Sequence, residues 1–245
     1  MIWPHLSSLS MPGTRRSHIR IAFFAFVAFG LLWHVAGRTG ETATPLPPPE
    51  VDSPKSAGGA TQTAVLAGGC FWGVQGVFQH TKGVKNVLAG YSGGEKTTAK
   101  YEQVGSGRTG HAESVQIIFD PREISYGEIL RIYFSVAHNP TELNRQGPDT
   151  GTQYRSAIFY ADASQQRIAQ AYIAQLDRAH VFPQPIVTRV DPFKAFYPAE
   201  AYHQDFLVRH PDHPYIIFND APKIASLKKL FPQDYREQPV LSVQN

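Results

Sequence analysis

The stretch that decides the fold is AVLAGGCFWGVQGVF, residues 64–78. Its apolar run VLA, at 65–67, is typical of a short buried strand. Two glycines follow and permit a sharp bend, and the apolar side chains beyond them recur at the spacing of a helix over 71–81. The pattern therefore predicts a strand, a tight turn and a helix, with Cys70 at the turn.

Outside this unit, strands and helices alternate without a regular order. Ser125 and Glu128 have the spacing of a capping box, and the polar loop 138–155 has a length that is more often functional than idle. This mixture predicts the α+β class, a two-layer α/β sandwich around a small mixed sheet. We expect further strands over 84–92, 111–119, 156–161 and 186–190, and further helices over 126–137, 164–179, 199–209 and 221–231.

The N-terminal region differs from the rest of the chain. Arginines at positions 15, 16 and 20 precede the apolar run 21–37, a pattern typical of a secretory signal, and TRRSHIR (14–20) partly matches a twin-arginine signal. A helix over this run would span about 25 Å, slightly less than the roughly 30 Å of a bilayer core. Cleavage and membrane attachment through 19–37 both stay open. A buried core helix fits less well, because the run has no amphipathic period. We therefore expect 1–37 to direct export to a bacterial-type periplasm or cell envelope.

A change in composition marks the expected domain boundaries. Residues 38–62 are rich in proline and then in glycine and serine, the composition of a linker. We expect the folded domain over 63–237 and a C-terminal tail over 238–245. Residues 1–62 carry five Lys and Arg against three Asp and Glu, whereas 63–245 carry eighteen against seventeen. A nearly neutral domain argues against nucleic-acid binding through a broad basic face.

Cys70 is the only cysteine of the chain, which excludes an intrachain disulfide and a cysteine-ligated metal cluster. It is either a small buried residue or a reactive nucleophile. The start of a helix favours the nucleophile, because its backbone N–H groups and dipole stabilise a thiolate and lower the thiol pKa. Phe71 and Trp72 project about 100° apart on a helix, so one of them can face the thiol. An aromatic wall there suits a thioether methyl group.

Four motifs carry a resemblance to a known family: GCFWG (69–73), KYEQV (100–104), TGHAE (109–113) and GPDTGTQYRS (147–156). In this order they make the chain similar to the peptide methionine sulfoxide reductase A family along most of 63–237. The resemblance implies a ferredoxin-like core with long loops. It also implies an oxidoreductase that reduces methionine-S-sulfoxide, protein-bound or free, and so repairs oxidised proteins.

The resemblance assigns catalytic roles to five residues of these motifs. Cys70 would attack the sulfoxide sulfur, and Glu113 would protonate the departing oxygen. Tyr101 and Tyr154 would hold that oxygen by hydrogen bonds, and Asp149 would orient the tyrosines and the thiol network. The chemistry agrees, since the oxygen must leave sulfur with a proton and a buried carboxylic acid keeps its proton near neutral pH.

The resemblance also places substrate and reductant. Phe71 and Trp72 would cradle the ε-methyl group of the substrate, and the product on Cys70 would be a sulfenic acid. Many members of the family resolve this acid with a second cysteine, but residues 214–245 contain none. We therefore expect an external thiol donor, such as thioredoxin, glutaredoxin with glutathione, or dithiothreitol. We expect no bound cofactor or metal, and a monomeric enzyme.

Other interpretations of these residues stay open. Cys70 could serve a hydrolase or acyl-transferase with His111 or His138 as its base, or GCFWG could be packing in a non-catalytic envelope domain. Taken singly, Glu113 could be a solvated strand residue and Asp149 a turn cap. A set of histidines and aspartates could also suggest a metal site, although their spacing matches no strong ligand pattern. This set comprises His203, Asp205, His210, Asp212 and His213.

Overall fold

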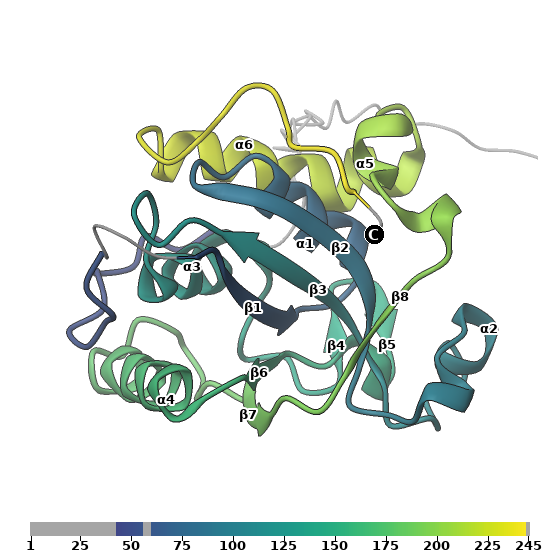
Figure 1. Cartoon of the computed structure of the whole chain (residues 1–245), viewed down its shortest axis with the longest axis horizontal. Helices are drawn as coiled ribbons and strands as arrows, with labels where there is room; N and C mark the ends of the chain where they lie inside the picture. The colour runs from purple at the N-terminus through teal and green to yellow at the C-terminus, as the bar shows by residue number, and fades with distance from the viewer. Residues whose placement is uncertain (1–42, 56–59, 244–245) are drawn as a thin grey trace, which may run out of the picture. The chain divides into compact units, whose positions relative to one another are not determined.

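A six-stranded mixed sheet lies at the centre of the part of the chain that the computed structural model describes, residues 43–55 and 60–243 (Figure 1). The strand order is β7-β6-β1-β3-β2-β8, and neighbouring strands are antiparallel except for the parallel pair β6 and β7. A separate two-stranded ribbon joins β4 to β5. The strands are β1 (Gln62–Ala67), β2 (Val84–Ser92), β3 (Ala112–Phe119), β4 (Arg145–Gln146), β5 (Asp149–Thr150), β6 (Ala157–Tyr160), β7 (Arg189–Pro192) and β8 (Phe196–Pro198).

Helices cover the sheet. Helix α1 packs against β2 and β3, α6 packs against α1, and α3 contacts α4 at the other end of the sheet (Figure 1). The α-helices are α1 (Phe71–Gln79), α2 (Tyr101–Val104), α3 (Tyr126–Ile132), α4 (Ala163–Arg178), α5 (Phe206–Arg209) and α6 (Ala221–Leu230). Shorter helical turns are η1 (Lys96–Thr98), η2 (Tyr133–Ala137), η3 (Thr152–Tyr154), η4 (Ala201–His203) and η5 (Ile216–Asp220).

The central strands have the ferredoxin-like topology. In chain order the elements are β1, α1, β2, β3, α3 and β6, and the sheet order of these four strands is β6-β1-β3-β2. This is the βαββαβ arrangement, with the last strand beside the first. The predicted α+β class and ferredoxin-like core are confirmed, and the parallel edge strand β7 makes the sheet mixed.

The two faces of the sheet belong to different apolar clusters. On β3, Val115, Ile117 and Phe119 belong to the main core, which also contains residues of α1, whereas Ala112 belongs to a second, smaller cluster. Successive side chains of a strand point to opposite faces. Glu113 therefore lies on the same face as Val115 and Ile117, among the apolar side chains of the main core.

The helix predicted over 126–137 forms in two parts. The predicted capping box is confirmed: Ser125 Oγ accepts from the N–H of Glu128 at 3.1 Å, and a Glu128 carboxylate oxygen accepts from the N–H of Ser125 at 2.8 Å. Helix α3 ends at Ile132, and the wider π-helical turn η2 follows. Within η2, the hydroxyl of Tyr133 donates to the carbonyl of Ala67 at 2.6 Å, at the end of β1. The π turn thus braces the strand that leads to Cys70.

The helix predicted over 199–209 is wrong as a single element. It is divided into η4 and α5, because Asp205 lies in the left-handed region with φ 57°. Gln204 bonds both backbone groups of Ala89, at 3.0 Å and 2.9 Å. The buried Asp205 carboxylate accepts from Gln79 at 2.6 Å. At this break, hydrogen bonds made by the side chains of Gln204 and Asp205 take the place of the backbone hydrogen bonds that a continuous helix would make.

The other predicted elements are present with shifted ends. The strand predicted over 186–190 begins later, at Arg189, and the helix predicted over 71–81 ends at Gln79. The strand predicted at 65–67 begins earlier, at Gln62. The strands predicted over 84–92, 111–119 and 156–161, and the helices predicted over 164–179 and 221–231, begin and end within one residue of the prediction.

Segments on both sides of the predicted domain pack against it. In the predicted linker, Leu46 is buried, the carbonyl of Pro47 accepts from the hydroxyl of Tyr172 at 2.8 Å, and Asp52 accepts from the N–H of Gly127 at 2.8 Å. In the predicted tail, the N–H of Val240 donates to the carbonyl of Gln79 at 3.1 Å. Residues 43–55 and 238–243 therefore add contacts to the fold.

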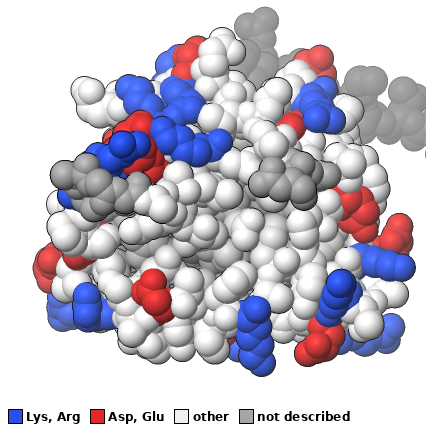
Figure 2. Space-filling model, viewed as in Figure 1, with Lys and Arg blue, Asp and Glu red and all other residues white. Residues whose placement is uncertain are grey.

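The predicted export segment, 1–37, lies outside the described residues. Within the residues that are described, no helix combines the length and the apolar character needed to cross a membrane. Figure 2 shows one face of the molecule, on which Lys and Arg alternate with Asp and Glu around a broad uncharged area.

Candidate active site

Cys70 lies at the junction of β1 and α1, where it is the N-cap residue of the helix. Its side chain is half-buried. Gly69 has φ 83°, and a Cβ at this position would lie 2.5 Å from the Cβ of Gln146. Only glycine fits this turn without strain, so the loop that carries Gln146 presses against the backbone that presents the thiol.

The surroundings of Cys70 favour the protonated thiol. Burial, followed by the negative charges of Asp220 and Glu113, raises the pKa of Cys70 well above its usual value. The backbone N–H of Trp72 acts in the opposite direction and is outweighed. The expectation that the helix start lowers this pKa is therefore wrong, because burial of the thiol, together with carboxyl groups from distant elements, outweighs the backbone N–H.

Glu113 is buried beside the start of α1. Its side chain is 4% exposed, and Oε2 accepts a hydrogen bond from the N–H of Phe71 at 3.0 Å. Burial raises the pKa of Glu113 to about 8, although this hydrogen bond lowers it. A carboxyl group that is protonated near neutral pH can act as a general acid beside the thiol.

The two predicted tyrosines come to the same site. Tyr101 is the first residue of α2 and Tyr154 is the last of η3. Burial, with the charge of Glu113, raises the pKa of Tyr101 to about 12 and raises that of Tyr154 as well. Both phenols therefore keep their protons and can donate hydrogen bonds near neutral pH.

Asp149 begins β5 and is half-buried. It accepts a hydrogen bond from the hydroxyl of Tyr215. Burial raises the pKa of Asp149, against the lowering effects of this hydrogen bond and of Lys223. The structure thus links Asp149 to Tyr215, a residue that no motif marks among the eleven tyrosines.

Phe71 and Trp72 project in different directions, as helical geometry predicts. Phe71 is buried, whereas Trp72 is half-buried. The indole of Trp72 stacks on Phe206 with ring centroids 3.7 Å apart and an interplanar angle of 8°. Its ring centroid lies 6.1 Å from that of His213 and 5.8 Å from that of Tyr215, and both pairs of rings meet edge to face. Trp72 therefore belongs to an aromatic cluster at the site.

A second carboxylate, which sequence reasoning missed, holds Tyr101. Glu200 accepts from the N–H of Tyr101 at 3.0 Å and from the hydroxyl of Tyr91 at 2.9 Å. Tyr91 is buried and lies opposite Glu113 in the pairing of β2 with β3. The only local signal of this role is the density of polar and aromatic residues in FYPAEAYHQDF, residues 196–206.

The structure offers no Cys–His pair among the described residues. His111 Nδ1 accepts from the N–H of Gly94 at 3.3 Å, and its Nε2 lies 3.0 Å from the carbonyl of Glu95. His138 Nδ1 lies 3.1 Å from the carbonyl of Tyr133, and burial lowers the pKa of His138 to about 3. Both histidines are held by the backbone, which argues against a hydrolase that uses either as the base for Cys70.

The predicted set of histidines and aspartates is divided among other tasks. His203 accepts a hydrogen bond from the indole N–H of Trp72, and Asp205 accepts one from the side-chain amide of Gln79. The rings of His210 and His213 contact the ring of Phe206. Within the described residues, no group of three or more His, Cys, Asp or Glu side chains is arranged to hold a metal ion.

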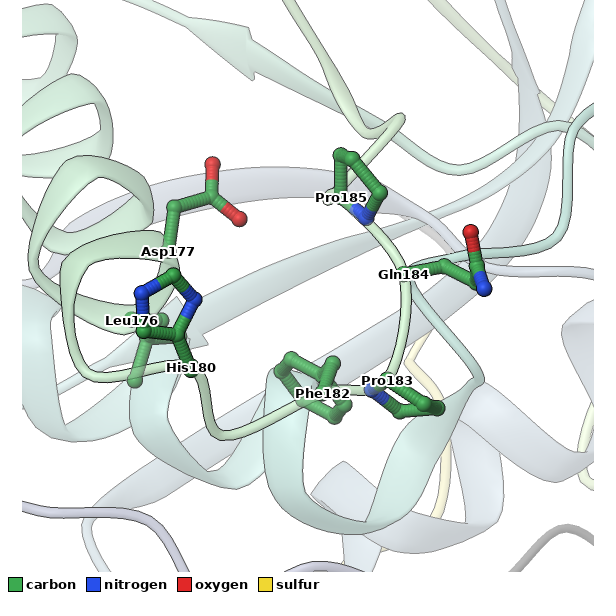
Figure 3. Close-up of a pocket in the computed structure, with 7 residues that line it drawn as sticks. All are labelled: Leu176, Asp177, His180, Phe182, Pro183, Gln184 and Pro185. Atoms are coloured by element: carbon green, nitrogen blue, oxygen red, sulfur yellow. The ribbon is translucent and has the colours of Figure 1, made fainter.

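A surface pocket of ≈ 360 Å³ lies at the end of α4 (Figure 3). It shares no lining residue with the Cys70 site. The carboxylate of Asp177 accepts a hydrogen bond from the N–H of Ile186 at 3.2 Å and so stabilises the loop that follows α4. The lining residues are Leu176, Asp177, His180, Phe182, Pro183, Gln184 and Pro185.

Comparison with known proteins identifies the family. The family model of the peptide methionine sulfoxide reductases matches residues 62–235. A peptide methionine sulfoxide reductase MsrA 2 of Mesorhizobium japonicum is 61% identical over 187 residues, which cover 76% of this chain and 96% of the relative. A peptide methionine sulfoxide reductase MsrA 2 of Synechocystis is 50% identical over 195 residues, which cover 79% of this chain and 91% of the relative.

Solved structures agree with this assignment. Mxr1 of Saccharomyces cerevisiae in its reduced form matches with a TM-score of 0.57 and 30% identity, over 67% of this chain and 92% of that chain. Methionine sulfoxide reductase A of Corynebacterium diphtheriae matches with a TM-score of 0.54 and 31% identity, over 69% of this chain and 88% of that chain. This chain belongs to the peptide methionine sulfoxide reductase A family and is an oxidoreductase.

Proposed function

We propose that this enzyme reduces methionine-S-sulfoxide, in proteins and as the free amino acid, by transferring the sulfoxide oxygen to Cys70. The observation that carries the proposal is the pairing of a half-buried thiol with a buried acid, Glu113, whose pKa is raised to about 8. The S epimer and the repair of oxidised proteins follow from membership of the family.

Binding places the sulfoxide between aromatic and phenolic groups. Phe71 and Trp72 would contact the ε-methyl group, for which an aromatic wall is suited. The hydroxyls of Tyr101 and Tyr154, which stay protonated, would donate to the sulfoxide oxygen. Asp149, which accepts a hydrogen bond from the hydroxyl of Tyr215, would orient the side chains of Tyr101 and Tyr154 toward the sulfoxide oxygen.

In the first half-reaction, Glu113 gives a proton to the substrate and regains one from the thiol of Cys70. Glu113 donates its proton to the sulfoxide oxygen while Cys70 sulfur attacks the substrate sulfur, and the thiol proton passes to the Glu113 carboxylate. The hydroxyl then moves from the substrate sulfur to the sulfur of Cys70. The products are the thioether and a Cys70 sulfenic acid, with the substrate reduced by two electrons and Cys70 oxidised by two.

An external thiol would complete the cycle. Cys70 is the only cysteine of the sequence, so the sulfenic acid has no intrachain partner. A donor thiol would attack the sulfenic acid with loss of water to give a mixed disulfide, and a second thiol would release Cys70 as the free thiol. A thioredoxin-like dithiol supplies both thiols in one molecule, and glutaredoxin with glutathione or dithiothreitol supplies the same chemistry.

We further propose export of the chain through residues 1–37 and action as a monomer. The export proposal rests on Arg15, Arg16 and Arg20 before the apolar run 21–37. The intact mass of protein recovered from the cell envelope distinguishes a cleaved signal from a retained anchor. Recovery of the full-length chain only in the cytoplasm would contradict export.

One experiment tests the mechanism directly. The reduced protein is mixed with one equivalent of a methionine-S-sulfoxide peptide without a thiol donor, and its mass is measured. The expected result is the gain of one oxygen on Cys70 together with one equivalent of methionine peptide. Cys70→Ser is the control and is expected to give neither. Formation of the thioether without oxygen on Cys70 would overturn the assigned nucleophile.

A further inference from the structure

Trp72 is fixed by two different contacts. Stacking on Phe206, at 3.7 Å and 8°, defines the plane of the indole but leaves it free to slide and rotate within that plane. The second contact removes this freedom, because the indole Nε1–H donates to Nδ1 of His203 at 3.1 Å. His203 therefore determines where the edge of the indole lies.

The same imidazole contacts the other aromatic residues of the site. Its ring centroid lies 4.4 Å from that of Tyr101 and 5.0 Å from that of Phe71. His203 is 2% exposed. A single buried ring thus touches the two residues proposed to cradle the methyl group and one of the phenols proposed to hold the oxygen.

The hydrogen bonds of His203 define its protonation. Nδ1 accepts from Trp72, so it carries no proton, and the neutral ring has its proton on Nε2. Nε2 is buried and meets no hydrogen-bond partner among the described residues.

From these contacts we infer that His203 is a positioning residue for the substrate pocket, which sets Trp72 and Tyr101 only while its imidazole is neutral. This inference rests on the proposed sulfoxide reduction at Cys70. A protonated ring would present an N–H to the indole N–H, and two donors cannot bond to each other. Protonation would therefore release the edge of Trp72.

The charged groups around His203 act in opposite directions. The carboxylates of Glu200, before η4, and of Glu102, on α2, favour the cation, whereas burial disfavours it and dominates. The other rings packed on His203 are Tyr202, at 4.2 Å, and the three pocket residues. The pKa of His203 is consequently lowered, so the pocket stays assembled at neutral pH and fails on the acidic side.

The test uses the full chain with Trp3→Phe and Trp33→Phe, so that Trp72 is the only tryptophan. Its fluorescence emission is expected to change in one transition with a midpoint below about 6.5, the usual pKa of histidine. His203→Phe keeps a ring but removes the acceptor, and should abolish the transition. His203→Asn returns an acceptor at the place of Nδ1 and should restore the neutral-pH emission without titrating. Far-UV circular dichroism at each pH excludes unfolding as the cause.

Kinetics provide the second readout. His203→Phe is expected to raise KM for a methionine-S-sulfoxide peptide at least fivefold with a smaller change in kcat, and His203→Asn should recover most of the loss. His180→Asn, at an exposed position after α4, is the control and should match the parent. The inference is overturned if His203→Phe keeps both the emission transition and KM. Because emission is read without turnover, it decides even if the parent reduces no sulfoxide. If His203→Phe does not fold, loss of the transition in His203→Asn decides, because His213, whose ring also contacts Trp72, is unchanged in that variant.

Discussion

The backbone N–H of Phe71 donates a hydrogen bond to Oε2 of Glu113 at 3.0 Å, which ties the first turn of α1 to the middle of the sheet. This bond places the proposed acid beside the helix start that carries the proposed nucleophile. It also lowers the pKa of Glu113, but burial outweighs it and the pKa reaches about 8. The geometry of the pair and its protonation are therefore set by different interactions.

Glu113→Gln separates these two contributions. Glutamine keeps an oxygen for the N–H of Phe71 but has no acidic proton, so the rate of sulfenic acid formation should fall about 10²–10⁴-fold. In the parent, the raised pKa means that the acid form is lost as pH rises through about 8. The single-turnover rate should decline across that range in the parent and show no such decline in Glu113→Gln.

The control for this experiment is Glu237→Gln, at an exposed position near the C-terminus that pairs with Lys228. Its rate and pH profile should match the parent. Should Glu113→Gln keep the rate of the parent, Glu113 would not be the acid. An unchanged alkaline decline in Glu113→Gln would assign the decline to another group.

Asp220 is expected to keep the Cys70 thiol protonated. It is the first charged group among the causes that raise the pKa of Cys70, after burial, whereas Asp149 is the weakest of the causes that raise it. Asp220→Asn should therefore lower this pKa more than Asp149→Asn does. Each unit of pKa corresponds to about a tenfold change in the thiolate fraction below the pKa.

The measurement is the rate of alkylation of Cys70 by iodoacetamide at pH 7, followed by mass spectrometry. We expect the order Asp220→Asn above Asp149→Asn above the parent, since the thiolate is the reacting form. Thiolate absorbance at 240 nm gives the pKa independently. Equal rates in all three proteins would show that neither Asp220 nor Asp149 contributes to the pKa of Cys70.

The motifs predict which residues the fold brings together, but not the electrostatics of the place where they meet. Cys70, Glu113 and Tyr101 lie in local patterns with a chemical reason for each residue, and the fold brings them together. From the sequence, the pKa of Cys70 is expected to fall, because the helix start is the only nearby group that the sequence reveals. Burial of the thiol depends on the whole fold, and Asp220, 150 positions away, comes near the thiol through the packing of η5 against α1.

The segment around His203 shows the same limit for the fold. Its apolar and polar spacing predicts one helix over 199–209, but Gln204 and Asp205 are buried and bonded to Ala89 and Gln79. Their partners are more than 100 residues away, and these bonds hold a left-handed residue that periodicity does not reveal. Glu200, before the break, bonds to Tyr101, and Phe206, after it, stacks on Trp72.

Gly69→Ala is expected to destabilise the protein strongly. The position combines φ 83° with a Cβ that would lie 2.5 Å from the Cβ of Gln146, so alanine suffers both backbone strain and a clash. Gly147→Ala is the matched control, because its φ is 52° and nothing lies within 4 Å of the added Cβ. The control should lose about 1 kcal/mol of unfolding free energy, the cost of the left-handed conformation.

Denaturant unfolding measures both variants. Gly69→Ala should lose at least about 2–3 kcal/mol, because the steric clash adds to the conformational cost. Gln146→Ala removes the γ-carbon contact but not the Cβ contact, and it also removes two hydrogen bonds to the backbone of Asn139. Measured against Gln146→Ala alone, Gly69→Ala should therefore still be destabilising, but less so than in the parent. Equal destabilisation at positions 69 and 147 would show that the loop of Gln146 moves aside without cost.

The predicted tail contributes to stability through Asp205. This buried carboxylate accepts from Gln79 at 2.6 Å, and from the N–H and hydroxyl of Ser242 at 2.9 Å and 3.1 Å. Deletion of 238–245 removes both bonds from Ser242 and the backbone bond from Val240 to Gln79. Loss of hydrogen bonds to a charged group costs about 1.5–3 kcal/mol, although water will replace part of it at the newly exposed edge.

The midpoint of thermal unfolding should therefore fall when 238–245 is deleted, and Ser242→Ala should account for only the smaller part of the fall, since its backbone N–H remains. Asp205→Asn, made in the full chain and in the truncated chain, tests the same contact from the other side. Oδ1 of Asp205 accepts from both Gln79 and the N–H of Ser242, whereas Oδ2 accepts from the hydroxyl of Ser242. Asparagine keeps the first oxygen but loses the second acceptor and the negative charge, so it should destabilise the full chain more than the truncated one. Equal effects of Asp205→Asn in the two backgrounds would show that the tail does not act through this carboxylate.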